Sequence, residues 1–242
     1  MHAEIGIDSL IIIFQCLSIL LIVWLTSKFG IHPILKSVDK IRNDEQMPII
    51  GANEFRYLAR MYNKMYSVYK SSIAKLNYKA SHDELTGLYN RAGYDLLLSG
   101  IDLQSTFLLL IDVDDFKTIN DTFGHDIGDS VLIRVAKTLS DHFRSDDYVC
   151  RIGGDEFAVF MVHADSTQQK LIEDKLRQIN FELAKKDENQ SCTSISVGIA
   201  HGSQAADPQM LFKHVDEALY ETKRGGKKGY TFYQVQYQQR TG

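Results

Sequence analysis

The sequence predicts an α/β (α+β) fold in which helices cover a central sheet, preceded by an apolar helix and a helical stalk. Three observations support this prediction. Residues 9–27 contain no charged side chain, residues 28–80 follow a helical pattern, and strand-like and helix-like segments alternate from about residue 81 onward. A chain of 242 residues has room for one compact domain with smaller attachments.

The charge balance is mildly acidic, with 27 basic and 31 acidic side chains. This balance argues against a general nucleic-acid-binding protein, so no nucleic-acid partner is expected. The three cysteines, Cys16, Cys150 and Cys192, are odd in number and widely spaced. A disulfide framework or a zinc site is therefore not expected, and a reducing compartment fits the composition.

The apolar segment 9–27 is predicted to span a membrane, because about twenty residues at about 1.5 Å each cross a bilayer core. The short tail 1–8 before it carries acidic residues, whereas Lys28, Lys36 and Lys40 follow it. The positive-inside rule then predicts a single-pass protein of the inner (cell) membrane with its carboxyl-terminal part in the cytoplasm. The alternatives are a secretory signal peptide and a buried core helix, although no basic region precedes the segment.

Residues 28–80 are predicted to form two amphipathic helices that are separated by a connector with Pro48 and Gly51. The apolar face of the first consists of Ile34, Val38 and Ile41, and that of the second of Phe55, Leu58, Met61 or Tyr62, Met65 and Val68. With Pro33 early in the first helix and Glu54 opening the second, the segment resembles a HAMP module. An ordinary coiled-coil stalk is the alternative. Either one would pair two subunits.

The alternating part that follows contains segments of both secondary-structure types. Predicted strands cover residues 106–112, 147–152, 156–163, 192–200 and 230–234. Predicted helices cover residues 90–99, 127–143, 167–185 and 208–223. This alternation indicates a sheet covered by helices.

Two glycines and two acidic residues, Gly153, Gly154, Asp155 and Glu156, lie between two of the predicted strands. A β-hairpin is expected there, with glycine providing the positive φ of a tight turn. The adjacent carboxylates repel each other, and such a repulsion is usually offset by a cation. Because the glycines have no side chains, a flat ligand such as a purine can approach the backbone closely.

A second acidic cluster, residues 112–115, follows directly after the predicted strand that ends at Asp112. Lys117 lies two residues beyond it, before the next helical run. Acidic groups at the ends of two strands, together with a lysine, suit divalent cations with oxygen ligands and the phosphates they neutralise.

Together, the runs 112–129 and 151–157 resemble the GGDEF family of diguanylate cyclases, and the resemblance extends from residue 83 to residue 227. It implies a GGDEF domain at 81–234, followed by a polar tail at 235–242. It also implies a mostly antiparallel five-stranded sheet like that of nucleotide cyclases and polymerase palm domains. The implied reaction joins two GTP molecules into cyclic di-GMP and two pyrophosphates, with one GTP on each subunit of a homodimer.

The resemblance also implies roles for individual residues. The metal ligands would be Asp112, the Val113 carbonyl and Asp155, and the cofactor would be Mg²⁺ or Mn²⁺, two per active half-site. The catalytic residues would be Asp155, which can help to remove the 3′-hydroxyl proton, and Glu156. Guanine would contact Asn120 and Asp129, which without the resemblance would be interpreted as a turn residue and a helix cap. The phosphates would contact Lys117, Lys223 and Lys227; the family commonly has arginine at the last position, so lysine there loses a bidentate contact.

A regulatory site is implied by Arg144 and Asp147, which match the family's inhibitory Arg-x-x-Asp pattern before the glycines. Cyclic di-GMP would then be an inhibitor as well as the product. Two alternatives to an enzyme remain at this point. One is a catalytically silent nucleotide receptor with the same fold, and the other is a membrane-tethered interaction protein.

Overall fold

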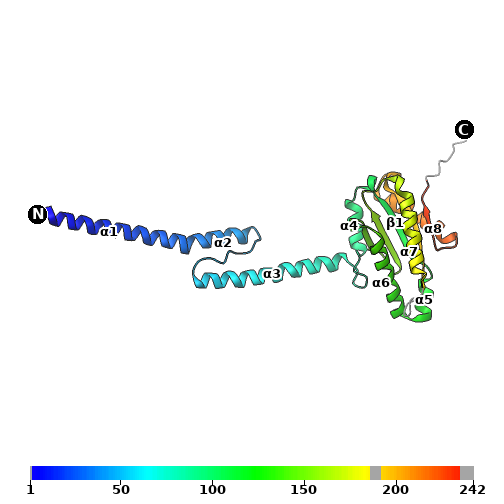
Figure 1. The fold of residues 1–242 in the computed structure, drawn as a ribbon, viewed down its shortest axis with the longest axis horizontal. Helices are drawn as coiled ribbons and strands as arrows, with labels where there is room; N and C mark the ends of the chain where they lie inside the picture. The colour runs from blue at the N-terminus through cyan, green and yellow to red at the C-terminus, as the bar shows by residue number, and fades with distance from the viewer. Residues whose placement is uncertain (1, 186–191, 235–242) are drawn as a thin grey trace, which may run out of the picture. The chain divides into compact units, whose positions relative to one another are not determined.

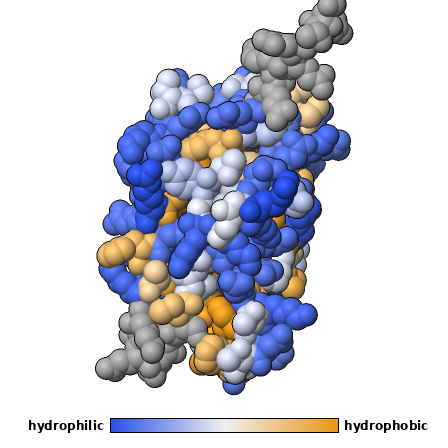
Figure 2. Space-filling model, turned by 90° about the vertical axis from the view of Figure 1, so that its right-hand side faces the viewer, coloured by the Kyte–Doolittle hydropathy of each residue, from blue (hydrophilic) through white to orange (hydrophobic). Residues whose placement is uncertain are grey.

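The computed structural model describes residues 2–185 and 192–234 (Figure 1). It divides into two compact units, Met1–Leu76 and Asn77–Gly242. The first is helical, and the second contains the sheet. Figure 2 shows one face of the molecule, which is mostly hydrophilic with small and scattered apolar patches. The polar tail predicted at 235–242 lies outside the described residues.

The first unit begins with α1, His2–Thr26, which continues through a π-helical turn, Ser27–Ile31, into α2, His32–Arg42. The described part of the chain has one helix long and apolar enough to cross a membrane, Leu10–Arg42, and none of its most apolar window is buried. The helix predicted over 9–27 is therefore present. Its length and composition are compatible with a membrane span, and a signal sequence would pass the same test.

The stalk continues with α3, Asn53–Ser81, after a non-helical connector. Asn63 fastens this connector to α3, because its side chain accepts from the Met47 N–H at 2.7 Å and donates to the Met47 carbonyl at 2.8 Å. Gly51 has a φ of +96° and lies against Pro33. The predicted apolar face of α3 is exposed in the single chain, as the 66% exposure of Met65 shows. A partner helix would bury it.

The second unit is built on a five-stranded sheet of order β2-β3-β1-β4-β5. The strands are β1 Phe107–Val113, β2 Tyr148–Arg151, β3 Glu156–Met161, β4 Ile195–His201 and β5 Tyr230–Phe232. All neighbours are antiparallel except the pair β4–β5, which is parallel. The mostly antiparallel five-stranded sheet is thus confirmed.

Helices cover both faces of this sheet (Figure 1). They are α4 Arg91–Gly100, α5 Phe116–Phe123, α6 His125–His142, α7 Gln169–Leu183 and α8 Pro208–Arg224. Because side chains alternate along β1, Leu109 packs in a core with α6 and α7, whereas Leu110 packs in a second core with α4 and α8. Burial on both faces explains why the central strand is a continuous apolar run.

Two details differ from the sequence-based expectations. The short helix α5 was not predicted, because Asp, Asn and Gly residues around it favour a loop in isolation. It begins after Asp115, whose φ of 57° turns the chain sharply out of β1. Strand β4 begins at Ile195 rather than at 192, since the preceding residues bond to other segments. The site described next depends on both features.

Candidate functional site

The two acidic clusters lie side by side because β1 and β3 are neighbours. Asp112 pairs with Glu156 in the register of these strands. The backbone N–H of Val113 donates to the Asp155 carbonyl at 3.1 Å. The structure therefore joins the two runs that the sequence analysis singled out, although they are far apart in the chain.

Asp112 is a largely enclosed carboxylate at the end of β1, with 15% of its side chain exposed. Lys223, from the last turn of α8, places Nζ 2.6 Å from Asp112 Oδ2. Burial raises the pKa of the Asp112 carboxyl above its usual value, and the negative charge of Asp155 raises it further. The positive charge of Lys223 lowers this pKa but offsets the increase only in part. The Asp112 carboxylate thus lies where an additional positive charge would be stabilising.

The predicted phosphate ligands come from two separate segments. Lys227 lies in the loop after α8 and places Nζ 2.8 Å from Asp115 Oδ1. Lys117 lies in the first turn of α5 and is exposed, close to backbone N–H groups that have no partner within the helix. Lys223 and Lys227 both contact the acidic cluster 112–115, so two of the three predicted ligands are brought together there, while Lys117 lies on the next helix.

Only one of the two features expected of the turn glycines is found in the structure. The hairpin between β2 and β3 exists, but Gly153 and Gly154 are not among the residues with positive φ, so that part of the prediction was wrong. The turn is longer than two residues, since Ile152 N–H bonds to the Glu156 carbonyl at 2.9 Å. A Cβ at Gly153 would lie 2.7 Å from Glu156 Oε2, whereas one at Gly154 would meet nothing within 4 Å. Gly154 therefore leaves open space beside the acidic pair, where a ligand can approach.

The donor set fits a divalent cation that is bound together with a phosphate ligand. Within the described residues, no group of three or more His, Cys, Asp or Glu side chains is arranged to hold a metal by itself. Mg²⁺ commonly binds through one or two carboxylates and completes its shell with phosphate oxygens and water. Asp112, Asp155 and the Val113 carbonyl can supply such a partial shell.

Packing of α5 on α6 brings the two predicted guanine-contacting residues together. A Cβ at Gly128 would overlap with Asn120 Oδ1 and would lie 3.4 Å from the Phe116 ring, so Asn120 rests directly on the α6 backbone. Asp129 follows Gly128 and is exposed. Neither residue is the turn residue or helix cap of the alternative interpretation, because each lies inside a helix.

Comparison with known proteins identifies the family. Residues 80–229 match the family described as "Diguanylate cyclase, GGDEF domain". The chain belongs to the GGDEF family. It is 34% identical over 165 residues to Probable diguanylate cyclase DgcI of Escherichia coli (strain K12). This alignment covers 68% of this chain and 34% of that protein. It is 32% identical over 197 residues to Diguanylate cyclase TpbB of Pseudomonas aeruginosa. This alignment covers 75% of this chain and 45% of that protein. The chain thus spans less than half the length of either relative.

Solved structures confirm the fold of the GGDEF domain. The coiled coil and GGDEF domain of DgcB from Caulobacter crescentus, in complex with c-di-GMP, has a TM-score of 0.61 and 25% identity, over 73% of this chain and 98% of that one. A variant of PA1120 (TpbB or YfiN) from Pseudomonas aeruginosa that comprises only the GGDEF domain has a TM-score of 0.57 and 34% identity, over 64% of this chain and 95% of that one.

The first residues of the GGDEF domain hold the glycine turn, a contact that the sequence analysis missed. Arg151 Nη1 lies 3.0 and 3.2 Å from the two oxygens of Asp83, and its Nη2 donates to the Gly154 carbonyl at 2.9 Å. Asp83 also accepts from the side chain and backbone of Thr86. The signal in the sequence was the arginine just before the glycines, which could not be paired without the fold.

The Asp83 contact should be visible in the pH dependence of stability. Burial acts to raise the pKa of Asp83, but hydrogen bonds from Thr86 and Arg151 outweigh it and leave that pKa below its usual value. The carboxylate therefore stabilises the folded state at neutral pH, and this contribution is lost as the pH falls through the folded-state pKa. We expect Asp83→Asn to lower the free energy of unfolding by about 1–2 kcal/mol at pH 7 and by less in acid. Thermal unfolding followed by circular dichroism measures both.

Glu84→Gln is the matched control for this prediction. Glu84 pairs with Lys79 at 2.7 Å, but its side chain is 76% exposed, so its loss should change stability little. Equal losses in the two variants, or a loss in Asp83→Asn that is independent of pH, would contradict the assigned role of Asp83.

The predicted inhibitory residues of the GGDEF domain lie in the loop before β2. Asp147 is buried, and its two oxygens accept from the backbone N–H groups of Arg144 at 2.9 Å and Val162 at 3.2 Å. Arg144 is exposed. Both residues line a pocket of about 250 Å³ that also includes His82 and Tyr89. Asp147 therefore shapes the loop, and Arg144 presents the free charge.

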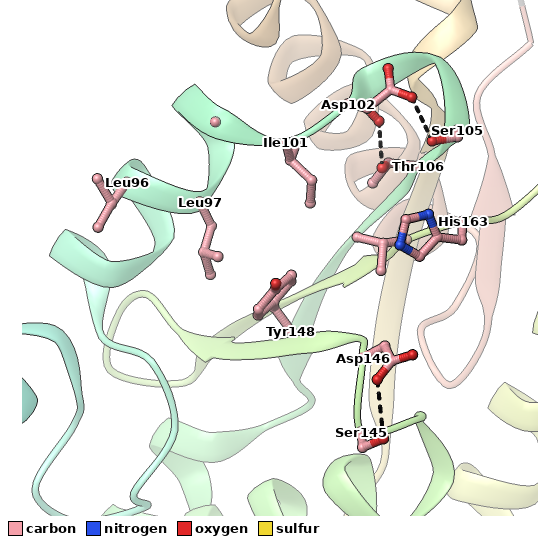
Figure 3. A pocket seen from close by; sticks show the side chains of 12 residues that line it. Leu96, Leu97, Ile101, Asp102, Ser105, Thr106, Ser145, Asp146, Tyr148 and His163 are labelled. Atoms are coloured by element: carbon pink, nitrogen blue, oxygen red, sulfur yellow. Dashed lines mark hydrogen bonds between the residues drawn. The ribbon is translucent and has the colours of Figure 1, made fainter.

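A larger pocket of about 600 Å³ includes Ser145 and Asp146 of the same loop in its lining (Figure 3). Leu97, Ile101 and Tyr148 form an apolar wall, while Asp146 and His163 lie at its polar rim. It contains none of the predicted metal, guanine or phosphate ligands and lies at the opposite end of β1 from Asp112. The acidic residues at the end of β1 and the start of β3 therefore form a site that is separate from this pocket.

Proposed function

We propose that this chain is a diguanylate cyclase that condenses two GTP molecules into cyclic di-GMP and two pyrophosphates. The observation that supports this most is the pairing of Asp112 with Glu156 across β1 and β3, beside Lys223. It combines carboxylates that suit a divalent cation with an ammonium group that suits a triphosphate. Membership of the GGDEF family supports the same reaction.

In the proposed reaction, the 3′-hydroxyl oxygen of each GTP forms a bond to the α-phosphorus of the other, so the same step occurs twice. The bond from that phosphorus to pyrophosphate breaks, and the hydroxyl proton leaves. Asp155 would help to remove this proton, and the adjacent Glu156 would contribute to binding of the metal or nucleotide. Mg²⁺ or Mn²⁺, two per half-site, would supply positive charge that stabilises the departing pyrophosphate and lowers the pKa of the attacking hydroxyl. Asp112, the Val113 carbonyl and Asp155 would hold these ions.

The substrate would be oriented at both of its ends. Lys117, Lys223 and Lys227 would bind phosphate oxygens, with Lys223 and Lys227 exchanging their present carboxylate partners for the triphosphate. Asp129 can accept from the N1–H and 2-amino groups of guanine, and Asn120 can bond to its remaining polar edge. Adenine lacks that pair of donors, so the site should favour GTP over ATP.

The active form would be a membrane-anchored homodimer. Each subunit holds one GTP, so one reaction needs two chains, and the exposed apolar face of α3 supports their pairing through a HAMP-like or coiled-coil stalk at 28–80. The exposed apolar side chains of α1 support a single membrane span, with the GGDEF domain at 81–234 in the cytoplasm.

The decisive experiment incubates the purified full-length protein in detergent with GTP and Mg²⁺ and analyses the nucleotides by chromatography and mass. Cyclic di-GMP is expected, at a rate that rises faster than the protein concentration. Bound GTP without product, in a preparation shown to be dimeric, would indicate the silent receptor instead. Absence of nucleotide binding would indicate an interaction protein.

Product inhibition is proposed to act through Arg144, which is exposed and therefore free to bind a phosphate of cyclic di-GMP. We expect Arg144→Ala to raise the half-inhibitory concentration at least about tenfold, the loss of one charge-assisted contact, with little change in the initial rate. Arg177→Ala, which removes an exposed arginine from α7, is the matched control. Unchanged inhibition in Arg144→Ala would remove this residue from the inhibitory site.

A further inference from the structure

Asp114 is a buried carboxylate for which the proposed reaction has no role. It is 5% exposed, although it lies between the candidate metal ligand Asp112 and the exposed Asp115. Burying a carboxylate is unfavourable unless hydrogen bonds compensate for the lost water. The contacts of Asp114 therefore indicate what the residue does.

Three donors satisfy the Asp114 side chain. Ser196 Oγ donates to Oδ1 at 2.6 Å, and Ser194 Oγ donates to Oδ2 at 2.6 Å. The backbone N–H of Lys228 also donates to Oδ2, at 3.1 Å. In addition, the Asp114 N–H bonds to the Ser194 carbonyl at 2.9 Å. Hydrogen bonds to a charged acceptor are about twice as strong as neutral ones, so these contacts fix the carboxylate firmly.

These contacts join three segments that meet at the site. The first is the acidic loop after β1, the second is the chain entering β4, and the third is the loop after α8 that contains Lys227. The third segment is conformationally costly by itself, because Lys227 and Lys228 have φ values of 63° and 58°, which are unfavourable for residues with side chains. An anchor at Lys228 N–H lets the loop keep this shape.

We propose that Asp114 is a positioning residue that, with Ser194 and Ser196, holds the Lys227 loop in place beside the acidic cluster 112–115, where Lys227 contacts Asp115. The phosphate-binding ammonium group and the metal-binding carboxylate then face the same triphosphate before it arrives, which avoids an ordering cost on binding. This inference rests on the proposed function, since it explains how the same site is preorganised.

The test measures binding of 3′-deoxy-GTP, which cannot react at that position, to the full-length protein with Mg²⁺ by calorimetry. Ser194→Ala/Ser196→Ala removes both hydroxyl donors and leaves every charge in place. We expect its dissociation constant to rise about tenfold. Thr193→Val is the matched control, because it removes a buried hydroxyl from the same segment that does not contact Asp114. If circular dichroism shows that the double variant is not folded, the single variant Ser196→Ala is used in its place.

A double-mutant cycle separates positioning from a general loss of stability. If the serines act through Lys227, their replacement should weaken binding in the wild type and have little further effect in Lys227→Ala. Equal effects in both backgrounds, no effect in either, or unchanged binding in Lys227→Ala would each overturn the inference while leaving the proposed function intact. Failure of the wild type to bind the nucleotide would overturn the proposed function and this inference together.

Discussion

Replacement of Asp155 by alanine is expected to reduce cyclic di-GMP synthesis by at least about 10³-fold, because it removes one of the two carboxylates proposed to hold the metal. Asp155 lies at the end of the glycine turn, and its carbonyl bonds to Val113 N–H at 3.1 Å. Alanine keeps this backbone contact, so the fold should persist. The loss would then be chemical, and initial rates at saturating GTP and Mg²⁺ measure it.

Two controls make the Asp155 result specific. Asp155→Glu keeps a carboxylate one methylene longer and should retain measurable synthesis. The negative charge of Asp155 raises the pKa of Asp112, so the two carboxylates repel each other. In the absence of metal, Asp155→Ala removes this repulsion and should therefore unfold at or above the wild-type temperature. Near-normal synthesis by a folded Asp155→Ala would exclude Asp155 from the metal site.

Replacement of Gly198 by alanine is expected to lower the stability of the second unit strongly. Gly198 lies in β4 where α8 crosses it, and an added Cβ would overlap with the Val215 carbonyl oxygen and the Leu219 nitrogen. Both are backbone atoms, so no side-chain rotation relieves the overlap and α8 must move. We expect the free energy of unfolding to fall by about 3 kcal/mol or more. Thermal unfolding measures the change, and GTP binding should weaken because α8 carries Lys223.

Gly100→Ala is the matched control for Gly198→Ala. Gly100 ends α4, and an added Cβ would meet no atom within 4 Å, so little change is expected. Similar unfolding temperatures for the two variants would contradict the close packing of α8 on β4.

The sequence predicted the parts of this fold that depend on interactions between residues close together in the chain. The four longest helices of the second unit and all of its strands were expected near their observed positions, because periodicity and caps are local signals. An example is Asp207, whose side chain accepts from Met210 N–H at the start of α8. Helix α5 was missed because its residues favour loops, and the turn out of β1 at Asp115 sets its start.

The residues proposed to carry the chemistry could be named from the sequence, since Asp112, Asp155 and the three lysines lie in the runs that resemble the GGDEF family, within the matched residues 80–229. How these residues are held depends on the tertiary fold. Asp114 is buried against two serines in and just before β4, and Arg151 bridges Asp83 and the glycine turn, so both contacts join segments far apart in the chain. The physical reason is that burial and long-range hydrogen bonds depend on which strands become neighbours, and a strand's own residues do not specify its neighbour.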